Sequence, residues 1–210
     1  MIKKHLKLLI LTSVIILLPV LAGLALWNRL PDLLPVHWNT AGEVDKYYGK
    51  PFVVFAMPFL LLTLHWFAAL ITANDPKKQN QSEKIRKLVF WIVPAISVIL
   101  FAVTYATALG TGVKVEMILP VFLGVLFVVM GSYLPSCRQS YTIGIKLPWT
   151  LASEENWRRT HLLAGRVWMA GGVLILLSGL LATLWITLVA LIPMVVIPVV
   201  YSFILHRKGV

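Results

Sequence analysis

Long apolar runs alternate with short polar segments along the whole chain. The six runs are Leu8–Trp27, Phe52–Ala73, Leu88–Leu109, Met117–Leu134, Val167–Trp185 and Ile186–Leu205. An α-helix rises about 1.5 Å per residue, so about 20 apolar residues cross a hydrocarbon core of roughly 30 Å. The pattern therefore predicts an all-α, polytopic membrane protein in which six transmembrane helices form a single membrane domain over residues 1–210.

The polar segments between the runs predict three helical hairpins. They cover residues 8–73, with a loop at 28–51, residues 88–134 and residues 167–205, and a long polar segment at 135–166 precedes the last one. The third hairpin carries no charged residue, and no Gly or Pro cluster marks its turn. A single helix of that length would far exceed the thickness of one bilayer, so we predict a tight turn near Trp185–Thr187.

Composition and charge agree with a membrane location. Hydrophobic residues make up 59% of the chain and charged residues 13%, which is more apolar than soluble domains are. Fifteen of the 19 Lys and Arg residues lie in segments 1–7, 74–87, 135–166 and 206–210. The positive-inside rule makes these segments and both termini cytoplasmic, and the loop at 28–51 extracellular. The basic loops favour contact with anionic membrane lipids over direct nucleic acid binding.

The motifs of common enzymes are missing from the sequence. There is no His-Glu-x-x-His, no Gly-x-Ser-x-Gly, and no pair of carboxylates suited to acid–base chemistry. Cys137 is the only cysteine, and the five histidines are far apart in the sequence. We therefore expect no catalytic residue, cofactor or metal. His65 lies well inside a predicted span, where a hydrogen-bonded packing role is favoured over a proton relay.

The extracellular loop concentrates polar side chains in LPDLLPVHWNTAGEVDKYYGKP, residues 30–51. Its prolines and glycines exclude a regular helix, and Pro35–Asn39 is expected to be extended or a turn. Binding residues favour such loops on rigid supports. The candidate ligand-binding residues are His37, Trp38, Asn39, Asp45 and Lys50. The aromatic residues of the loop fit an interfacial belt equally well, so both interpretations stay open.

The inner segment contains the helix start that leads into the fifth span. Pro148 ends any preceding helix, and Thr150 or Ser153 can cap the next one. The residues Trp157, His161, Ala164 and Trp168 follow at the spacing of one helical face. This pattern fits an interfacial helix that runs into the fifth span, or a docking surface for a cytoplasmic protein.

Two motifs in these loops resemble the SdpI family, bacterial immunity proteins against the sporulation-delaying toxin. They are LPVHWN…G…D…K, residues 34–50, and GSYLP…YTIGIKLPWTLASEENWRRTH, residues 131–161. The first is similar to the amino-terminal segment of that family, which is a conserved domain of unknown function. Ser132 and Ser140 stand where the family usually has Asn, and Lys146 stands where Arg is usual. Lys keeps the charge but lacks the planar fork that permits a bidentate contact.

The resemblance implies an integral membrane immunity protein of the bacterial plasma membrane that protects its producer from a secreted SDP-type antimicrobial peptide. It also implies a signal transducer that sequesters an ArsR-type winged-helix autorepressor at the membrane. The candidate docking residues are Gly144, Lys146, Pro148, Trp149, Thr150, Trp157, Arg158 and His161. The alternative function is a small secondary transporter or peptide exporter. It is favoured by prolines in five of the spans and by a three-span arrangement that occurs twice.

Overall fold

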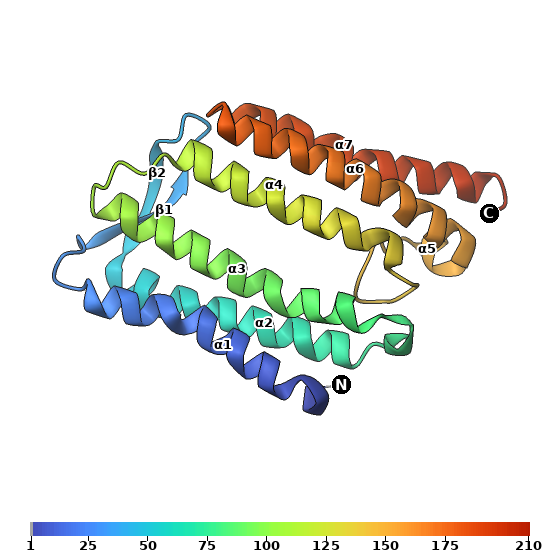
Figure 1. The fold of residues 1–210 in the computed structure, drawn as a ribbon, viewed down its shortest axis with the longest axis horizontal. Coiled ribbons are helices and arrows are strands. Elements are labelled where there is room, and N and C mark those ends of the chain that lie inside the picture. Colours follow the sequence, from blue (N-terminus) through green and yellow to red (C-terminus); the bar gives the residue numbers. More distant parts are fainter. Residues whose placement is uncertain (1) are drawn as a thin grey trace. The chain divides into compact units, whose positions relative to one another are not determined.

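The computed structural model describes the backbone of residues 2–210 and the side chains of residues 5–210. The lysine side chains at positions 3 and 4 therefore lie outside the described part. The elements in chain order are α1 (Ile2–Ala25), β1 (Leu33–Trp38), β2 (Val44–Gly49), the π-helix η1 (Phe52–Ala56), α2 (Met57–Ala73), the 3-10 helix η2 (Lys78–Asn80), α3 (Glu83–Ala108), α4 (Val115–Tyr133), the 3-10 helix η3 (Leu134–Ser136), α5 (Pro148–Ala152), α6 (Glu154–Leu180) and α7 (Leu184–Arg207) (Figure 1).

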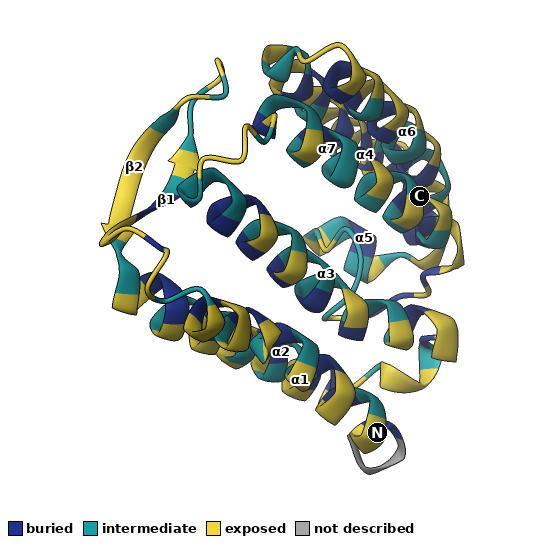
Figure 2. Ribbon diagram, turned by 60° about the vertical axis from the view of Figure 1, so that its left-hand side comes forward, coloured by how far each residue is buried: buried dark blue, intermediate teal, exposed yellow. Residues whose placement is uncertain are grey.

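Within the residues that the structure describes, six helical segments are long and apolar enough to cross a membrane, which confirms the predicted fold class. They are His5–Ala25, Phe52–Ala73, Glu83–Ala108, Val115–Ser136, Glu154–Leu180 and Leu184–Arg207. The second coincides with the predicted span, and the others differ from theirs mainly at the ends. Large apolar residues are exposed along these helices, as expected of surfaces that face lipid. Figure 2 shows exposed positions in yellow along the helices. The cytoplasmic placement of both termini stays a prediction.

The chain divides into two compact units, and three of these segments lie mainly in each, with the first turn of α3 in unit 2. Unit 1 is Met1–Ala73 with Lys87–Val115, and unit 2 is Asn74–Arg86 with Glu116–Val210. The division near residue 115 falls where the predicted three-span halves meet. The segment between α2 and α3 belongs to unit 2, so the chain leaves unit 1 after Ala73 and returns to it at Lys87.

Unit 1 is held together by an apolar cluster and by hydrogen bonds between helices. The buried cluster consists of Leu30, Leu34, Val53, Val54, Phe101 and Tyr105. His65 is 1% exposed, and its Nε2 lies 2.9 Å from Oγ1 of Thr12 on α1. The Trp66 indole donates to Ser13 Oγ at 3.0 Å in the same helix pair. Such bonds join helices where lipid offers no partner, and this is the packing role favoured for His65.

Unit 2 is built on a close contact between α4 and α6. A Cβ added to Gly172 would lie 2.8 Å from the backbone oxygen of Gly124, and one added to Gly165 would lie 2.8 Å from that of Gly131. A Cβ added to Gly179 would likewise lie 2.8 Å from the backbone oxygen of Met117. The contacts therefore recur every seven residues and run in opposite directions along the two helices. Only glycine lets the backbones approach this closely.

Two predicted boundaries in unit 2 change. The turn of the last hairpin lies at residues 181–183, between α6 and α7, so the prediction near Trp185–Thr187 was wrong. Ala182 adopts φ 51°, and the backbone N–H of Thr183 donates to Ser178 O at 2.9 Å, which ends α6 without a glycine. The interfacial helix runs into the fifth span as expected, but the resulting continuous helix begins at Glu154, whereas the span was predicted to begin at Val167.

Candidate functional site

The loop between α1 and α2 forms an antiparallel β-hairpin, residues 33–49, so its predicted extended segment is confirmed. In the register Leu34 faces Tyr48 and Trp38 faces Val44, with irregularities on both sides of His37. Asn39 builds the turn, because its Oδ1 accepts the backbone N–H groups of Ala41 at 2.9 Å and Glu43 at 3.0 Å. Asn39 is therefore used mainly by the turn itself.

The polar face of the hairpin centres on His37 and Asp45. His37 Nδ1 lies 2.6 Å from Asp45 Oδ1, and the two side chains are 57% and 39% exposed. Trp38 follows on the same strand, and its indole N–H has no hydrogen-bond partner within the described residues. Tyr47 and Tyr48 are both 52% exposed. The hairpin thus carries an accessible charge pair and two exposed tyrosine rings.

Lys50 lies apart from this face and points back into unit 1. Its side chain is 12% exposed, and Nζ donates to the backbone oxygens of Leu30 at 2.9 Å and Trp27 at 3.3 Å. The ammonium group also lies 5.0 Å from the centre of the Trp27 ring. A cation at these carbonyls stabilises the chain where α1 ends. Lys50 therefore supports the hairpin and does not join His37 and Asp45.

The signature loop, residues 137–153, folds over the first turns of α6. Trp157 and His161 stack with ring centres 4.1 Å apart, and both are buried. Ile145 N donates to His161 Nε2 at 2.9 Å, so the ring proton is on Nδ1, which donates to Trp157 O. Gly144 crosses this pair with φ 116°, and a Cβ there would lie 2.5 Å from His161 Nε2. The predicted face of α6 is thus an internal support for the loop.

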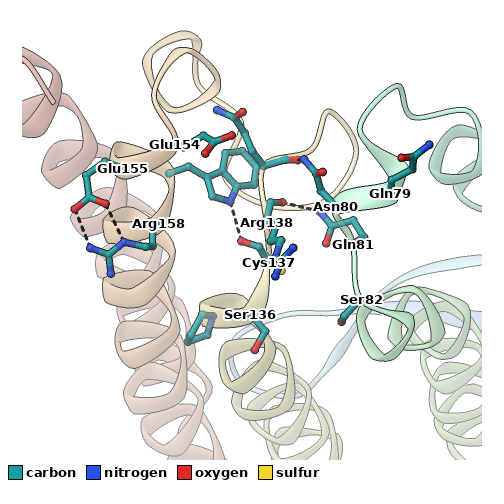
Figure 3. Close-up of a pocket in the computed structure, with 13 residues that line it drawn as sticks. Gln79, Asn80, Gln81, Ser82, Ser136, Cys137, Arg138, Glu154, Glu155 and Arg158 are labelled. Carbon is teal, nitrogen blue, oxygen red and sulfur yellow. Dashed lines mark hydrogen bonds and ion pairs between the residues drawn. The ribbon is translucent and has the colours of Figure 1, made fainter.

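Buried amide and hydroxyl groups hold the rest of the signature loop. Thr150 Oγ1 accepts from Leu147 N at 2.9 Å. Gln139 donates to the backbone oxygens of Thr150 at 3.0 Å and Leu151 at 2.8 Å. The Trp157 indole donates to Cys137 O at 2.8 Å (Figure 3). Burial raises the pKa of the Cys137 thiol to about 11.

Asp75 ties the segment after α2 to the signature loop. Its Oδ2 accepts from Ser140 Oγ at 2.6 Å, Thr142 Oγ1 at 2.7 Å and Tyr141 N at 3.0 Å, and its Oδ1 accepts from Lys77 N at 2.7 Å. Burial by itself would raise the pKa of Asp75. The four hydrogen bonds outweigh burial and hold that pKa below its ordinary value. Asp75 is therefore a buried anion held by neutral donors.

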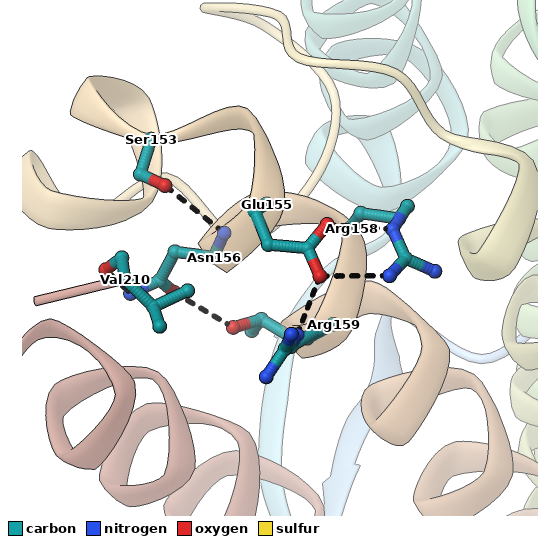
Figure 4. A network of polar contacts seen from close by, with 7 residues as sticks. Ser153, Glu155, Asn156, Arg158, Arg159 and Val210 are labelled. Atoms are coloured by element: carbon teal, nitrogen blue, oxygen red, sulfur yellow. Dashed lines mark hydrogen bonds and ion pairs between the residues drawn. The ribbon is translucent and has the colours of Figure 1, made fainter. Parts of the chain in front are cut away.

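Among the candidate docking residues, the exposed ones are Lys146, Pro148 and Arg158. Arg158 and Arg159 both donate to Glu155 beside the N-cap Ser153, which accepts from Asn156 N as predicted (Figure 4). Trp149 is half-buried, and its indole donates to Ser202 Oγ on α7 at 2.9 Å. The Asn156 amide donates to Val210 O at 3.1 Å. The loop is therefore fastened to the C-terminal end of the chain.

Sequence reasoning missed the residues that organise this region, namely Asp75, Gln139 and Gln81. Gln81 Nε2 donates to Arg138 O at 2.7 Å and helps to fasten the segment after α2. Asp75 carried a signal, because only four acidic residues lie in the segments expected to be cytoplasmic. The two glutamines carried none, because a polar residue in a loop gives no indication of its partner. Among the residues that the structure describes, no group of three or more His, Cys, Asp or Glu side chains could hold a metal ion.

Comparison with known proteins covers both regions. Residues 136–202 match the SdpI/YfhL protein family, and residues 14–62 match a domain of unknown function, DUF1648. The Immunity protein SdpI of Bacillus subtilis (strain 168) is 22% identical over 186 residues, which cover 87% of this chain and 86% of the relative. No solved structure matches. These matches confirm the relation to the SdpI family that the two motifs predicted.

Proposed function

We propose, from this relation to the SdpI family, that the chain is an integral membrane immunity protein that protects its bacterium from a secreted SDP-type antimicrobial peptide. The observation that carries the proposal is the similarity to Immunity protein SdpI along 87% of the chain. A non-enzymatic role agrees with this relation. The six apolar segments place the protein in the membrane on which such a peptide acts.

The peptide contact is assigned to the hairpin face around His37, Trp38 and Asp45. Its exposed His37–Asp45 pair offers polar partners, while Tyr47 and Tyr48 offer apolar surface. Lys50 and Asn39 act indirectly, because they hold the end of α1 and the turn of the hairpin. Loops on rigid supports commonly carry binding residues.

Survival of a sensitive bacterium challenged with the sporulation-delaying peptide tests both parts of the proposal. Expression of the protein is expected to protect, and the double variant His37→Ala/Asp45→Ala is expected to lower the tolerated peptide concentration by about tenfold. The matched control is Lys114→Ala, an exposed charge in the α3–α4 connection. All forms are compared at equal amounts in the membrane.

The outcomes separate the two claims. Absence of protection by the wild-type protein would remove this toxin from the proposal. Full protection by the double variant would leave immunity in place but remove the hairpin face as the contact.

The second part of the proposal is that the protein signals by holding an ArsR-type repressor at the membrane. The repressor would bind at the exposed residues Lys146, Pro148 and Arg158. Trp157, Thr150 and His161 are buried, so they would shape that surface from within. A fluorescent ArsR-type repressor from the same bacterium is expected to move to the membrane when peptide is added. If the repressor still moves to the membrane in cells with the Lys146→Ala/Arg158→Ala variant, as it does in wild-type cells, docking at these residues is contradicted.

A small transporter or peptide exporter is the second candidate function. The observation in its favour is the division into two units with three candidate spans each, which suits an inverted-repeat arrangement. Uptake or export of labelled peptide by sealed vesicles would support it. Protection without any flux across the vesicle membrane would contradict it.

A further inference from the structure

The hairpin formed by β1 and β2 is a sheet of only two strands within the described part of the chain, so each strand has one outer edge. The outer edge of a strand carries backbone N–H and C=O groups that no neighbouring strand pairs. The functions proposed above use side chains of this hairpin and assign no role to its main chain.

The register shows which backbone groups of β2 lie at its outer edge. Alternate residues of an antiparallel strand point their backbone groups toward the partner strand and away from it. Lys50 N donates to Asp32 O at 2.7 Å, so the main chain of Lys50 faces the β1 side. The alternation then turns the main chain of Tyr48 toward β1 and that of Tyr47 and Gly49 outward. The outer edge of β2 thus offers N–H donors and C=O acceptors at alternate residues.

The outer edge of β1 is closed to a further strand. Pro35 faces Tyr47 in the register, so its main chain also points outward, and proline has no backbone N–H to donate. Leu34 and Pro35 are buried, and Leu34 belongs to the apolar cluster of unit 1. β1 is therefore the strand that holds the hairpin on the helices, and only β2 has an edge with donors to offer.

The outer edge of β2 is open. The strand packs against β1 and η1, and four of its six residues are exposed (Figure 2). A Cβ added to Gly49 would find only Pro51 Cδ, at 4.0 Å, among the described atoms outside its chain neighbours. Tyr47 and Tyr48 are each 52% exposed and point to opposite faces of the strand. A further strand at this edge would therefore meet an aromatic ring on either face.

We propose that the outer edge of β2 binds an extended segment of the secreted peptide as a third strand. This inference rests on the proposed immunity function, which already assigns the peptide contact to His37 and Asp45 of the same hairpin. The N–H and C=O groups of Tyr47 and Gly49 pair with alternate residues of the peptide. The rings of Tyr47 and Tyr48 contact apolar side chains on its two faces. Main-chain hydrogen bonds then supply the affinity, and the tyrosines select apolar side chains.

A scan of N-methylated peptides against the wild-type protein tests the strand pairing. Each synthetic sporulation-delaying peptide carries one backbone N-methyl group, and its binding to the protein in nanodiscs is compared with its binding to empty nanodiscs. Methylation is expected to weaken binding about tenfold at every second residue of one segment and little at the residues between, because only alternate N–H groups face β2. Weakening without this alternation, or none at any residue, would overturn the proposal.

Two variants at one position separate the main chain from the side chain. Tyr47→Ala removes the ring, whereas Tyr47→Pro removes the ring and the outward N–H and leaves the backbone groups that face β1 in place. Pro35, which faces Tyr47, shows that such an outward position accommodates proline. Tyr47→Pro is expected to bind the peptide about tenfold more weakly than Tyr47→Ala. Equal affinities at equal melting temperatures would contradict the edge, and if Tyr47→Pro does not fold, the methylation scan decides alone.

The survival assay distinguishes a failure of this inference from a failure of the proposed function. If the wild-type protein neither binds the peptide nor protects, the proposed function and this occupant are both contradicted. Equal protection by Tyr47→Pro and Tyr47→Ala, beside a protective wild type, would keep the function and remove the edge. Normal peptide binding by Tyr47→Pro, with loss of cross-linked dimers, would assign the edge to a second copy of the chain instead.

Discussion

The Asp75 network makes the sharpest prediction about the stability of this protein. Asp75→Asn keeps the size of the side chain but removes its charge, and it turns an N–H₂ group toward atoms that are themselves donors. The carboxylate accepts four hydrogen bonds of 2.6 to 3.0 Å in a site where Asp75 is 2% exposed. Hydrogen bonds to a charged group contribute about 1.5–3 kcal/mol each, and the cost of burying the carboxylate offsets part of their sum.

The expected loss is therefore about 3 kcal/mol in the free energy of unfolding. In a chain of this size such a loss lowers the melting temperature by roughly 6–12 °C. Thermal unfolding in detergent, followed by tryptophan fluorescence, measures it. The matched control is Asp32→Asn, because the Asp32 side chain is 99% exposed and lies 3.4 Å from Lys50. Because the Asp32 carboxylate is fully solvated, this ion pair contributes at most about 1 kcal/mol.

The stability difference between wild type and Asp75→Asn is expected to depend on pH in one direction. The pKa of Asp75 is lower in the folded protein than in the unfolded chain, so ionised Asp75 favours folding. The difference between wild type and Asp75→Asn is expected to be full at neutral pH. It shrinks as the pH falls below about 4 and through the lower pKa of the folded protein. Equal melting temperatures of the Asp75 and Asp32 variants, or a difference unchanged at pH 3, would refute the reasoning.

Three further predictions follow from close contacts and burial. Gly172→Ala places a Cβ 2.8 Å from backbone atoms of α4 and is expected to cost about 1–3 kcal/mol by detergent melting, whereas Val173→Ala, at a 48% exposed neighbour, costs little. Gly144→Ala is expected to release the signature loop to limited proteolysis, since its φ of 116° and His161 both oppose a side chain; a digestion pattern like that of the wild type would contradict this. Cys137, 7% exposed and with a pKa raised to about 11, is expected to react with a maleimide at pH 7.5 only after denaturation, and rapid labelling of the folded protein would show that the loop opens.

The local pattern of the sequence was sufficient for the elements that depend on neighbouring residues. Apolar run length located all six membrane segments, because crossing a bilayer requires a minimum number of apolar residues in one helix. Pro35 and the residues after it predicted an extended segment or a turn, and the structure has a strand there; Ser153 was one of two predicted N-caps and is the one used by α6. The two family motifs led to the relation that the comparisons confirm. Each of these features is decided within a few residues of chain or by direct similarity.

Tertiary structure decided the features that join distant positions. Asp75 and Ser140 are 65 residues apart, and neither residue alone indicates that they form a hydrogen bond. Lys50 was predicted to be a ligand-binding residue, and only the fold shows that the hairpin returns its ammonium group to the carbonyl groups after α1. The turn at residues 181–183 was misplaced, since a uniformly apolar run contains no polar break to mark it. Such contacts depend on which groups the folded chain brings within bonding distance, and that information is not local.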